Sequence, residues 1–402
     1  MNTGNLKDII YNSVRCGPSA DIKMVDRPQV NPGLENFSSW YSAFHGYASL
    51  CVCMSGILLN IFNVTVLTRK HMHTPVNHIL TGLAISDITT MLSYVPFAIH
   101  FYCVHPTDVS TPEKNSIYWM TFLLFHINLT TVTHTISIWL CVSLSIIRFL
   151  HIRSPTRARS IRIARIKQSK YLVLLVYFAS VIVMVPNYLT NELKPVQISN
   201  NETNSTLYVL ESLRLGKNDT GPLVLINVWM YAVVAKLTPC LLITVFGCML
   251  LYQMQVQVRK RRSIIAKFSG SSGIKLREHS RTTKMLISVI VLFIVTELPQ
   301  GVLIVLSACK KNFFDTVYLP LGDIMDIVAL VNNAVNFVLY CSMSTKFRET
   351  FLRQYCSVPK FQKADNGFNL REKFDSYSNN NQTPTRKRII EIKIENYTLV
   401  RK

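Results

Sequence analysis

The sequence predicts an all-α membrane protein, a bundle of seven transmembrane helices followed by a short amphipathic eighth helix. The composition of the 402 residues is 49% hydrophobic and only 16% charged, and the apolar residues are gathered in blocks. Each block has about 20 residues with few or no charges, the length that a helix needs to cross the hydrocarbon core of a bilayer. The predicted spans are approximately Tyr47–Leu67, Ile79–Tyr102, Trp119–Ile147, Tyr171–Leu189, Leu223–Tyr252, Met285–Ala308 and Val317–Cys341.

The chain beyond the last span predicts one more helix. In the stretch "STKFRETFLRQYC", Phe347, Phe351 and Leu352 recur at helical spacing beside basic residues. This pattern indicates a helix that lies on the inner membrane surface, with Cys356 as a candidate for palmitoylation. The predicted parts of the chain are an extracellular tail over residues 1–42, the bundle over 43–343, the amphipathic helix over 344–356 and a disordered cytoplasmic tail over 357–402.

Basic residues mark one side of the membrane. The first short loop, the segments after the third and fifth spans, and the chain beyond Ser344 hold 32 of the 43 lysines and arginines but only 7 of the 22 acidic residues. Cytoplasmic loops carry such an excess, so we expect a multi-pass protein of the plasma membrane with an extracellular N-terminus and a cytoplasmic C-terminus. The net charge of +21 is therefore a signal of sidedness. Nucleic acid is not an expected partner, whereas part of the charge can touch anionic membrane lipid.

Glycosylation sequons and cysteines fit this orientation. Asn128 has a sequon inside the third span and is expected to be inaccessible. Cys16, Cys103 and Cys309 are the cysteines that could face the oxidising side, where at most one disulfide can close among them, and which pair stays open. The sequons in segments predicted to be external, where they can be glycosylated, are those of Asn36, Asn201, Asn204 and Asn218.

Polar residues inside the spans are the candidates for function. An ionisable group at bilayer depth costs about 2.5–3.5 kcal/mol, so it usually faces the bundle interior. Glu297 stands two residues before the helix-bending Pro299, and the second span carries Asp87. For the threonines, hydrogen bonds to their own backbone carbonyls are the stronger alternative, and Asn332 and Asn333 can simply tie helices together. The third span adds one polar face, made of His126, Thr130, Thr133, His134 and Ser137.

Single residues in most of the spans resemble a family signature. They match, in order and at suitable depth, the rhodopsin-like G-protein-coupled receptors, and the resemblance covers approximately residues 45–356. It implies the seven-helix fold and no enzymatic activity. The matching residues are Asn60, Asp87, Arg148, Pro239, Pro299, Asn336 and Tyr340.

The departures from the family pattern narrow the resemblance. "IRF" stands in place of Asp-Arg-Tyr, Phe337 in place of the helix-seven proline, and Glu297 in place of the helix-six tryptophan. The cysteines that commonly join the third helix to the long external loop are also missing. With "HTPVNHILTGLAISD", "HTISIWL" and "TELPQG", these features resemble invertebrate myosuppressin and FMRFamide-type neuropeptide receptors, including their nematode relatives.

That resemblance implies an extracellular agonist that is a short amidated peptide ending in Arg-Phe-amide. A cationic, aromatic ligand requires a buried anion and an apolar slot. We expect Asp326 or Glu297 to pair with the arginine, with Asp323 as a further carboxylate nearby. An equal alternative makes Glu297 a protonated, hydrogen-bonded structural residue. The other residues expected to line the cavity are Tyr94, Phe97, His100, Tyr102, His126, Thr130, His134 and Gln300.

The resemblance also implies a switch and its partners. Agonist binding would swing the sixth helix about Pro299, so that Arg148 and the basic inner loops meet a heterotrimeric G protein, with Asn336 and Tyr340 in the family's helix-seven motif. Receptor kinases and arrestin would act on the C-terminal tail. The one cofactor implied is an allosteric sodium ion in an interior oxygen cluster. Its candidate ligands are Asp87, Ser137, Asn332, Asn333 and Asn336.

Other classes of protein fit less well. A membrane transporter, the main alternative, predicts matching broken helices in two halves of the chain, and no such repeat is present. An intramembrane metalloenzyme would need a motif such as HEXXH, which is absent. An amine receptor would carry an aspartate near Thr130. A receptor for a different ligand class stays an open alternative.

Overall fold

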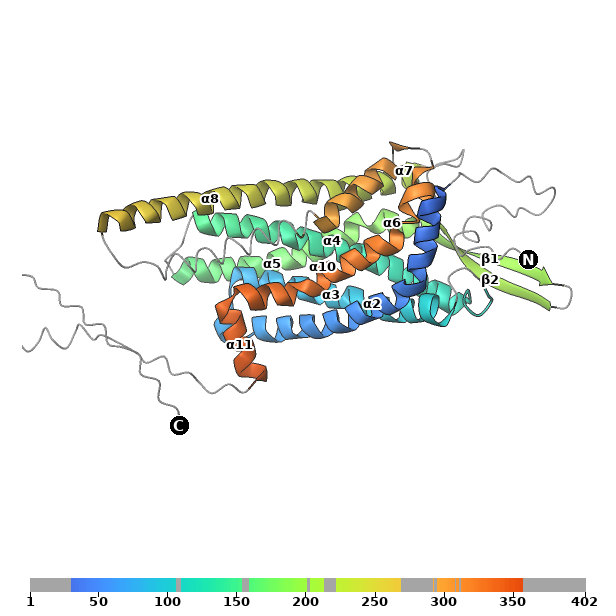
Figure 1. The fold of residues 1–402 in the computed structure, drawn as a ribbon, viewed down its shortest axis with the longest axis horizontal. Coiled ribbons are helices and arrows are strands. Elements are labelled where there is room, and N and C mark those ends of the chain that lie inside the picture. The colour runs from blue at the N-terminus through green and yellow to red at the C-terminus, as the bar shows by residue number, and fades with distance from the viewer. Residues whose placement is uncertain are drawn as a thin grey trace, which may run out of the picture. The chain divides into compact units, whose positions relative to one another are not determined.

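The structure is a computed structural model that describes residues 30–105, 110–153, 159–200, 203–212, 222–268, 292, 295–307, 309–310 and 312–356. Its helices lie side by side along one direction (Figure 1). The helical segments are α2 (Pro32–Leu67), η1 (Lys70–Met72), α3 (Pro75–Ala98), η2 (Ile99–Val104), α4 (Ile117–Arg153), α5 (Arg159–Val183), α6 (Val185–Leu189), α7 (Pro222–Trp229), η3 (Met230–Leu237), α8 (Thr238–Phe268), the Val295–Ser307 helix, η4 (Phe314–Tyr318), α10 (Gly322–Met343) and α11 (Thr345–Tyr355).

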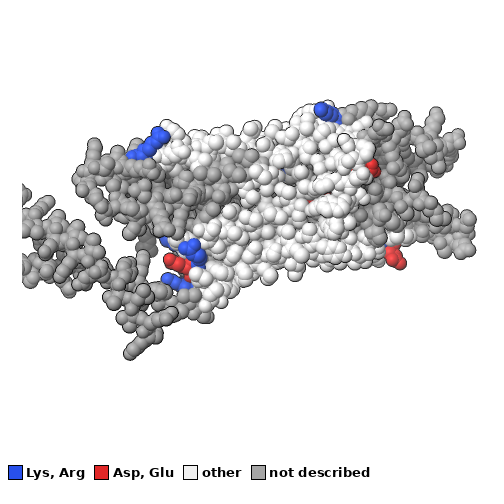
Figure 2. Space-filling view, in the orientation of Figure 1, with Lys and Arg blue, Asp and Glu red and all other residues white. Residues whose placement is uncertain are grey.

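Six helical runs among the described residues are long and apolar enough to cross a membrane. They correspond to the first five predicted spans and the seventh. The Val295–Ser307 helix is a shorter apolar piece of the predicted sixth span, and most of the rest of that span lies outside the described residues. On the face drawn in Figure 2, the coloured lysine, arginine, aspartate and glutamate residues gather towards the two ends, and the surface between them is almost free of charge. The all-α membrane class is confirmed.

Prolines and caps place the helix ends differently from the sequence-based spans. α2 begins at Pro32, well before the predicted tail boundary at residue 42, because Asn31 caps it by accepting a hydrogen bond from Gly33 N at 2.9 Å. The fourth span breaks between α5 and α6, where Pro186 cannot continue the hydrogen-bond ladder. The fifth span contains the π-helical segment η3 directly before Pro239.

The core is built mainly by α2, α3, α4 and α10. One cluster joins Cys53 on α2, Met91 on α3 and Leu330 on α10, all almost completely buried. Polar contacts add to this packing, since Asn60 Nδ2 donates to the backbone oxygen of Asn333 at 3.0 Å across the bundle. The family asparagine of the first span thus joins α2 to α10.

A β-hairpin covers part of the end of the bundle opposite α11 (Figure 1). Strands β1 (Asn191–Asn200) and β2 (Thr203–Ser212) pair antiparallel. The sequence analysis treated this segment only as an external loop. The hairpin is held to the turn just before α4 by two hydrogen bonds, from Tyr208 N to Asn115 O at 2.9 Å and from Asn115 Nδ2 to Tyr208 O at 3.2 Å. This reciprocal pair links the same two parts of the chain that the missing family disulfide would link.

The described cysteines are all unpaired. Cys103 and Cys309 therefore form no disulfide with each other or with another described cysteine, and Cys16 lies outside the described residues.

Helix α11 occupies the residues where the short amphipathic helix was expected. Ser344 caps it by accepting a hydrogen bond from Phe347 N at 3.2 Å. Phe347 is buried against Tyr340 and Leu67, Phe351 packs on the same cluster, and Leu352 stays partly exposed. The apolar face of α11 is thus used largely for packing on α2 and α10, and its contact with a membrane surface stays a prediction.

Candidate functional site

Two carboxylates, here called the acid pair, lie on the first turns of α10 beside two tyrosines. Asp326 is exposed and Asp323 is half-buried. Tyr102 OH donates to Asp323 Oδ1 at 2.8 Å, and Tyr94 OH lies 3.4 Å from Asp326 Oδ2. Among the described residues no lysine, arginine or histidine forms an ion pair with either carboxylate. The acid pair therefore has hydrogen-bond donors but no ion-pair partner among the described side chains.

An aromatic wall stands beside the acid pair. Phe97 stacks on His126 with ring centroids 4.5 Å apart, and Tyr94 meets both rings edge-on. Phe97 also contacts Tyr102 edge-on at 5.6 Å. His126 Nδ1 is held 3.1 Å from Ser93 Oγ, so its ring is fixed. Four of the residues expected to line the cavity thus lie together.

Two other expected cavity residues are occupied elsewhere. His100 stacks flat on Trp119 at 3.7 Å, and its Nε2 lies 3.1 Å from the carbonyl oxygen of Lys114. These contacts hold His100 against the start of α4, away from the acid pair. Thr130 Oγ1 donates to the carbonyl of His126 at 2.9 Å, which is the structural alternative considered for it.

A second polar group, here called the buried network, joins the third, fifth and sixth spans. Lys236 Nζ donates to Glu297 Oε2 at 3.1 Å and to Gln300 Oε1 at 2.6 Å. His134 Nε2 lies 3.1 Å from the same Glu297 oxygen and also contacts Lys236 Nζ. The side chains of Lys236 and Glu297 have exposed fractions of 0% and 1%. This is an ion pair shielded from water.

Lys236 was missed by the sequence analysis. The signal was present, since it is the only charged residue in the block Leu223–Tyr252, and intramembrane charges usually have an interior partner. The π-helical segment η3 carries Lys236 in its last turn, and such distortions are frequent at functional sites. Of the two interpretations of Glu297, neither included a lysine partner.

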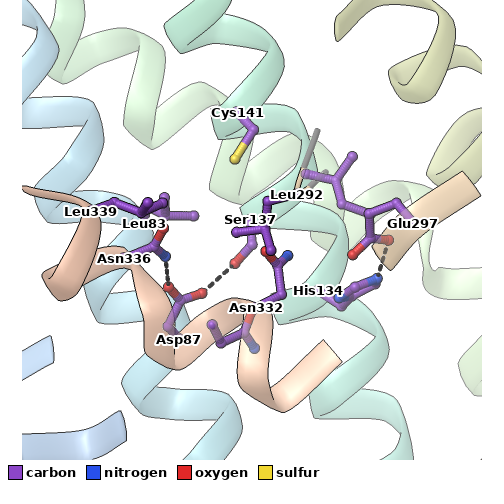
Figure 3. Close-up of a pocket in the computed structure, with 12 residues that line it drawn as sticks. Leu83, Asp87, His134, Ser137, Cys141, Leu292, Glu297, Asn332, Asn336 and Leu339 are labelled. Carbon is purple, nitrogen blue, oxygen red and sulfur yellow. Dashed lines mark hydrogen bonds and ion pairs between the residues drawn. The ribbon is translucent and has the colours of Figure 1, made fainter. Parts of the chain in front are cut away.

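The third polar group, the Asp87 cluster, lies deeper in the bundle. Ser137 Oγ donates to Asp87 Oδ1 at 3.0 Å, and Asn336 Nδ2 donates to Asp87 Oδ2 at 2.9 Å. A cavity of about 40 Å³ lies between this cluster and Glu297, and Figure 3 shows Asn332 between the two. Asn333 also lines this cavity. It has room for a water molecule or a small ion.

The other predicted residues lie in several parts of the fold. Arg148 on α4 and Tyr340 on α10 are close enough to interact electrostatically, and Pro299 lies within the Val295–Ser307 helix. Cys356 is exposed at the end of α11. Asn36 is exposed in the first turns of α2, the side chain of Asn204 on β2 is not described, and Asn201 and Asn218 lie outside the described residues. Asn128, expected to be inaccessible, accepts a hydrogen bond from Asn187 at 3.1 Å.

Comparison with known proteins decides the family. The family model described as "Serpentine type 7TM GPCR chemoreceptor Srw" matches residues 47–357. The chain belongs to this family. It is therefore a seven-transmembrane G-protein-coupled receptor, a multi-pass membrane protein and not an enzyme.

Relatives of this receptor include a G-protein coupled receptor of a nematode and two peptide receptors of a fly. It is 28% identical to the G-protein coupled receptor dmsr-1 of Caenorhabditis elegans, over 86% of this chain and 74% of that one. It is 25% identical to the sex peptide receptor of Drosophila melanogaster, over 76% and 71%. It is 26% identical to the FMRFamide receptor of the same fly, over 85% and 59%. The predicted resemblance to this group of receptors is confirmed.

Proposed function

We propose that this receptor binds an amidated neuropeptide of the Arg-Phe-amide or myosuppressin-like kind outside the cell and activates a heterotrimeric G protein inside it. The observation that carries the proposal is the acid pair, which includes the exposed Asp326, forms no ion pair with a described side chain and lies next to an aromatic wall. An arginine side chain can be bound there by charge-assisted hydrogen bonds, and a phenylalanine ring fits against Phe97 and His126. The relative named FMRFamide receptor supports the same ligand class.

The arginine is assigned to the acid pair and not to Glu297. A guanidinium brought to Glu297 would meet the ammonium of Lys236, which lies 3.1 Å from the carboxylate. Two like charges out of water repel each other strongly, and Glu297 is 1% exposed. Asp326 is exposed and forms no ion pair with a described side chain; Lys236 acts on it only through longer-range electrostatics, since its ion pair is with Glu297.

The test combines a receptor variant with a peptide variant. Asp326→Asn should lower the potency of an Arg-Phe-amide peptide about 10- to 100-fold, because a hydrogen bond to a charged group is worth about 1.5–3 kcal/mol. On the wild type, a peptide with citrulline in place of arginine should have a potency lower by a similar factor. On Asp326→Asn, the citrulline peptide and the arginine peptide should have nearly the same potency. Glu113→Gln, an exposed external carboxylate, is the matched control, and all variants are compared at equal surface level.

Two outcomes would contradict the proposal. If the citrulline peptide loses the same factor on Asp326→Asn as on the wild type, the arginine does not pair with Asp326. If Arg-Phe-amide peptides give no second-messenger response while another ligand class does, the ligand assignment is wrong.

The Asp87 cluster is assigned to a sodium ion in the resting receptor. Its carboxylate, the Ser137 hydroxyl and the Asn332 and Asn333 side chains around a cavity of about 40 Å³ offer oxygen atoms that suit a hard cation. Replacing sodium chloride with choline chloride should then raise agonist affinity for the wild type and not for Asp87→Asn. An equal sodium effect in both would remove this assignment.

The remaining parts of the proposal concern the switch and the topology. Movement of the sixth span about Pro299 would expose Arg148 to the G protein, with Asn336 and Tyr340 repacking at the inner end. The N-terminus is assigned to the outside, with Asn36, Asn201, Asn204 and Asn218 as glycosylation sites in the plasma-membrane receptor. The C-terminus is assigned to the cytoplasm, with Cys356 palmitoylated and the tail available to receptor kinases and arrestin.

A further inference from the structure

A groove on the outside of the bundle lies between the end of α2, the start of α3 and α5. Its volume is about 410 Å³. The floor is fixed by close packing, because a Cβ on Gly82 would lie 2.8 Å from Val173 Cγ1 and Tyr177 OH donates to the Gly82 carbonyl at 2.7 Å. One wall is apolar and includes Ile85 and Leu174, which are 46% and 65% exposed.

The surroundings of the groove are the lipid-facing surface of the receptor. Only 11% of the apolar window within Ile163–Leu189 is buried inside the protein. Leu174, Leu175 and Phe178 on this span are more than half exposed, as expected for side chains that contact acyl chains. A cavity in such a surface is filled by molecules of the bilayer, so its occupant is a lipid.

The rim of the groove carries basic groups. Lys170, His73 and His78 line it, and no carboxylate is among the lining residues. His73 Nδ1 lies 3.4 Å from His78 Nε2, and burial, together with the charges of Lys170 and His73, lowers the pKa of His78, so Lys170 is the permanent charge of the rim. Lys170 is also the last charged residue before the uncharged stretch Tyr171–Leu189, so it marks the level of the headgroups on this side.

These observations together select the class of lipid. We infer that this groove, here called the α3–α5 groove, is a binding site for an anionic phospholipid, with one acyl chain along Ile85 and Leu174 and the phosphate beside Lys170, His73 and His78. A negative headgroup can pair with Lys170 and favours the protonated form of the two histidines beside it. A basic residue near the membrane surface contributes attraction to anionic lipid. A sterol or a neutral phospholipid offers no such charge to the rim.

The headgroup contact is tested with a matched pair of lysine variants. The full receptor is placed in nanodiscs with equal amounts of phosphatidylcholine and phosphatidylserine, released with its bound lipids and weighed by native mass spectrometry. The wild type should retain phosphatidylserine in preference to phosphatidylcholine, and Lys170→Gln should lower that preference about fivefold. Lys167→Gln, an exposed lysine one turn earlier on α5 that does not line the groove, should leave it unchanged.

The acyl-chain contact is tested with a second pair. Leu174→Trp fills the groove and should reduce the retained phosphatidylserine, whereas Leu175→Trp, at a neighbouring position that is 61% exposed and outside the groove, should not. Equal retention of the two lipids by the wild type overturns the inference. The inference is also overturned if both lysine variants lose the preference for phosphatidylserine equally, or if both tryptophan variants retain equally less of it. Displacement of the phospholipid by added cholesterol would overturn it as well.

Discussion

Removing Lys236 should destabilise the receptor more than removing the whole ion pair. In Lys236→Met the carboxylate of Glu297, which is 1% exposed, loses its cation and one hydrogen bond. Leaving one charge of a buried pair without its partner costs about 3–5 kcal/mol. His134 and Gln300 remain as polar neighbours and can offset part of this cost.

The double variant separates the ion pair from simple loss of packing. Lys236→Met combined with Glu297→Gln removes both charges, so it should recover much of the stability lost in Lys236→Met. Thermal unfolding of the purified receptor, followed through the exposure of its cysteines to a thiol dye, measures each variant. Lys346→Met, which removes an exposed lysine on α11, should change little.

The reasoning fails if the destabilisation in the double variant equals the sum of those in Lys236→Met alone and Glu297→Gln alone. Additivity within about 0.5 kcal/mol is the behaviour of sites that do not interact, and it would mean that Lys236 and Glu297 are not paired in the folded receptor. A coupling energy of about 1 kcal/mol or more that stabilises the pair is the expected result.

Two further predictions concern the end of the bundle that carries the β1–β2 hairpin. Asn115→Ala should remove the side-chain hydrogen bond between the turn before α4 and the hairpin. Hydrogen–deuterium exchange in β2 should then become about fivefold faster, for a bond worth about 1 kcal/mol. Unchanged exchange would show that the hairpin is held by other contacts. Gly46→Ala places a methyl group 2.6 Å from Tyr102 Cβ, so it should displace Tyr102 from Asp323 and cost about 1–3 kcal/mol. It should also lower agonist potency, as Tyr102→Phe should by removing the hydrogen bond to Asp323. Gly322→Ala, which meets nothing within 4 Å, is its control, and equal potency in both alanine variants would refute the role of this contact.

Much of the fold could be predicted because the bilayer acts on each segment separately. A span must be long, apolar and helical whatever its neighbours are, so the stretch around Asp87 and the stretch around Arg148 can be recognised one at a time. Features that depend on contacts with other parts of the chain were not predicted. The α2 helix starts at Pro32 because Asn31 caps it, and the β1–β2 hairpin is held by a contact with Asn115, almost a hundred positions earlier in the chain.

The same distinction explains the site. Tyr94, Phe97, Tyr102 and His126 were predicted from their type and depth, and the structure brings them together. His100 shares that type and depth, yet it stacks on Trp119, because depth fixes how far along a helix a residue lies and not the neighbour that its side chain meets.

Glu297 shows how such a missing neighbour changes a chemical conclusion. Taken alone, a carboxylate at bilayer depth suits either a cationic ligand or a proton, and both choices neutralise it. Lys236 offers a third way to do so from a different helix, 61 positions earlier in the chain. A charged residue in an apolar span is therefore best interpreted together with every other intramembrane charge of the chain, since buried charges require a partner. Among the described residues Asp87 and the two carboxylates of the acid pair form no ion pair, and these are the positions where a cation from outside the chain can bind.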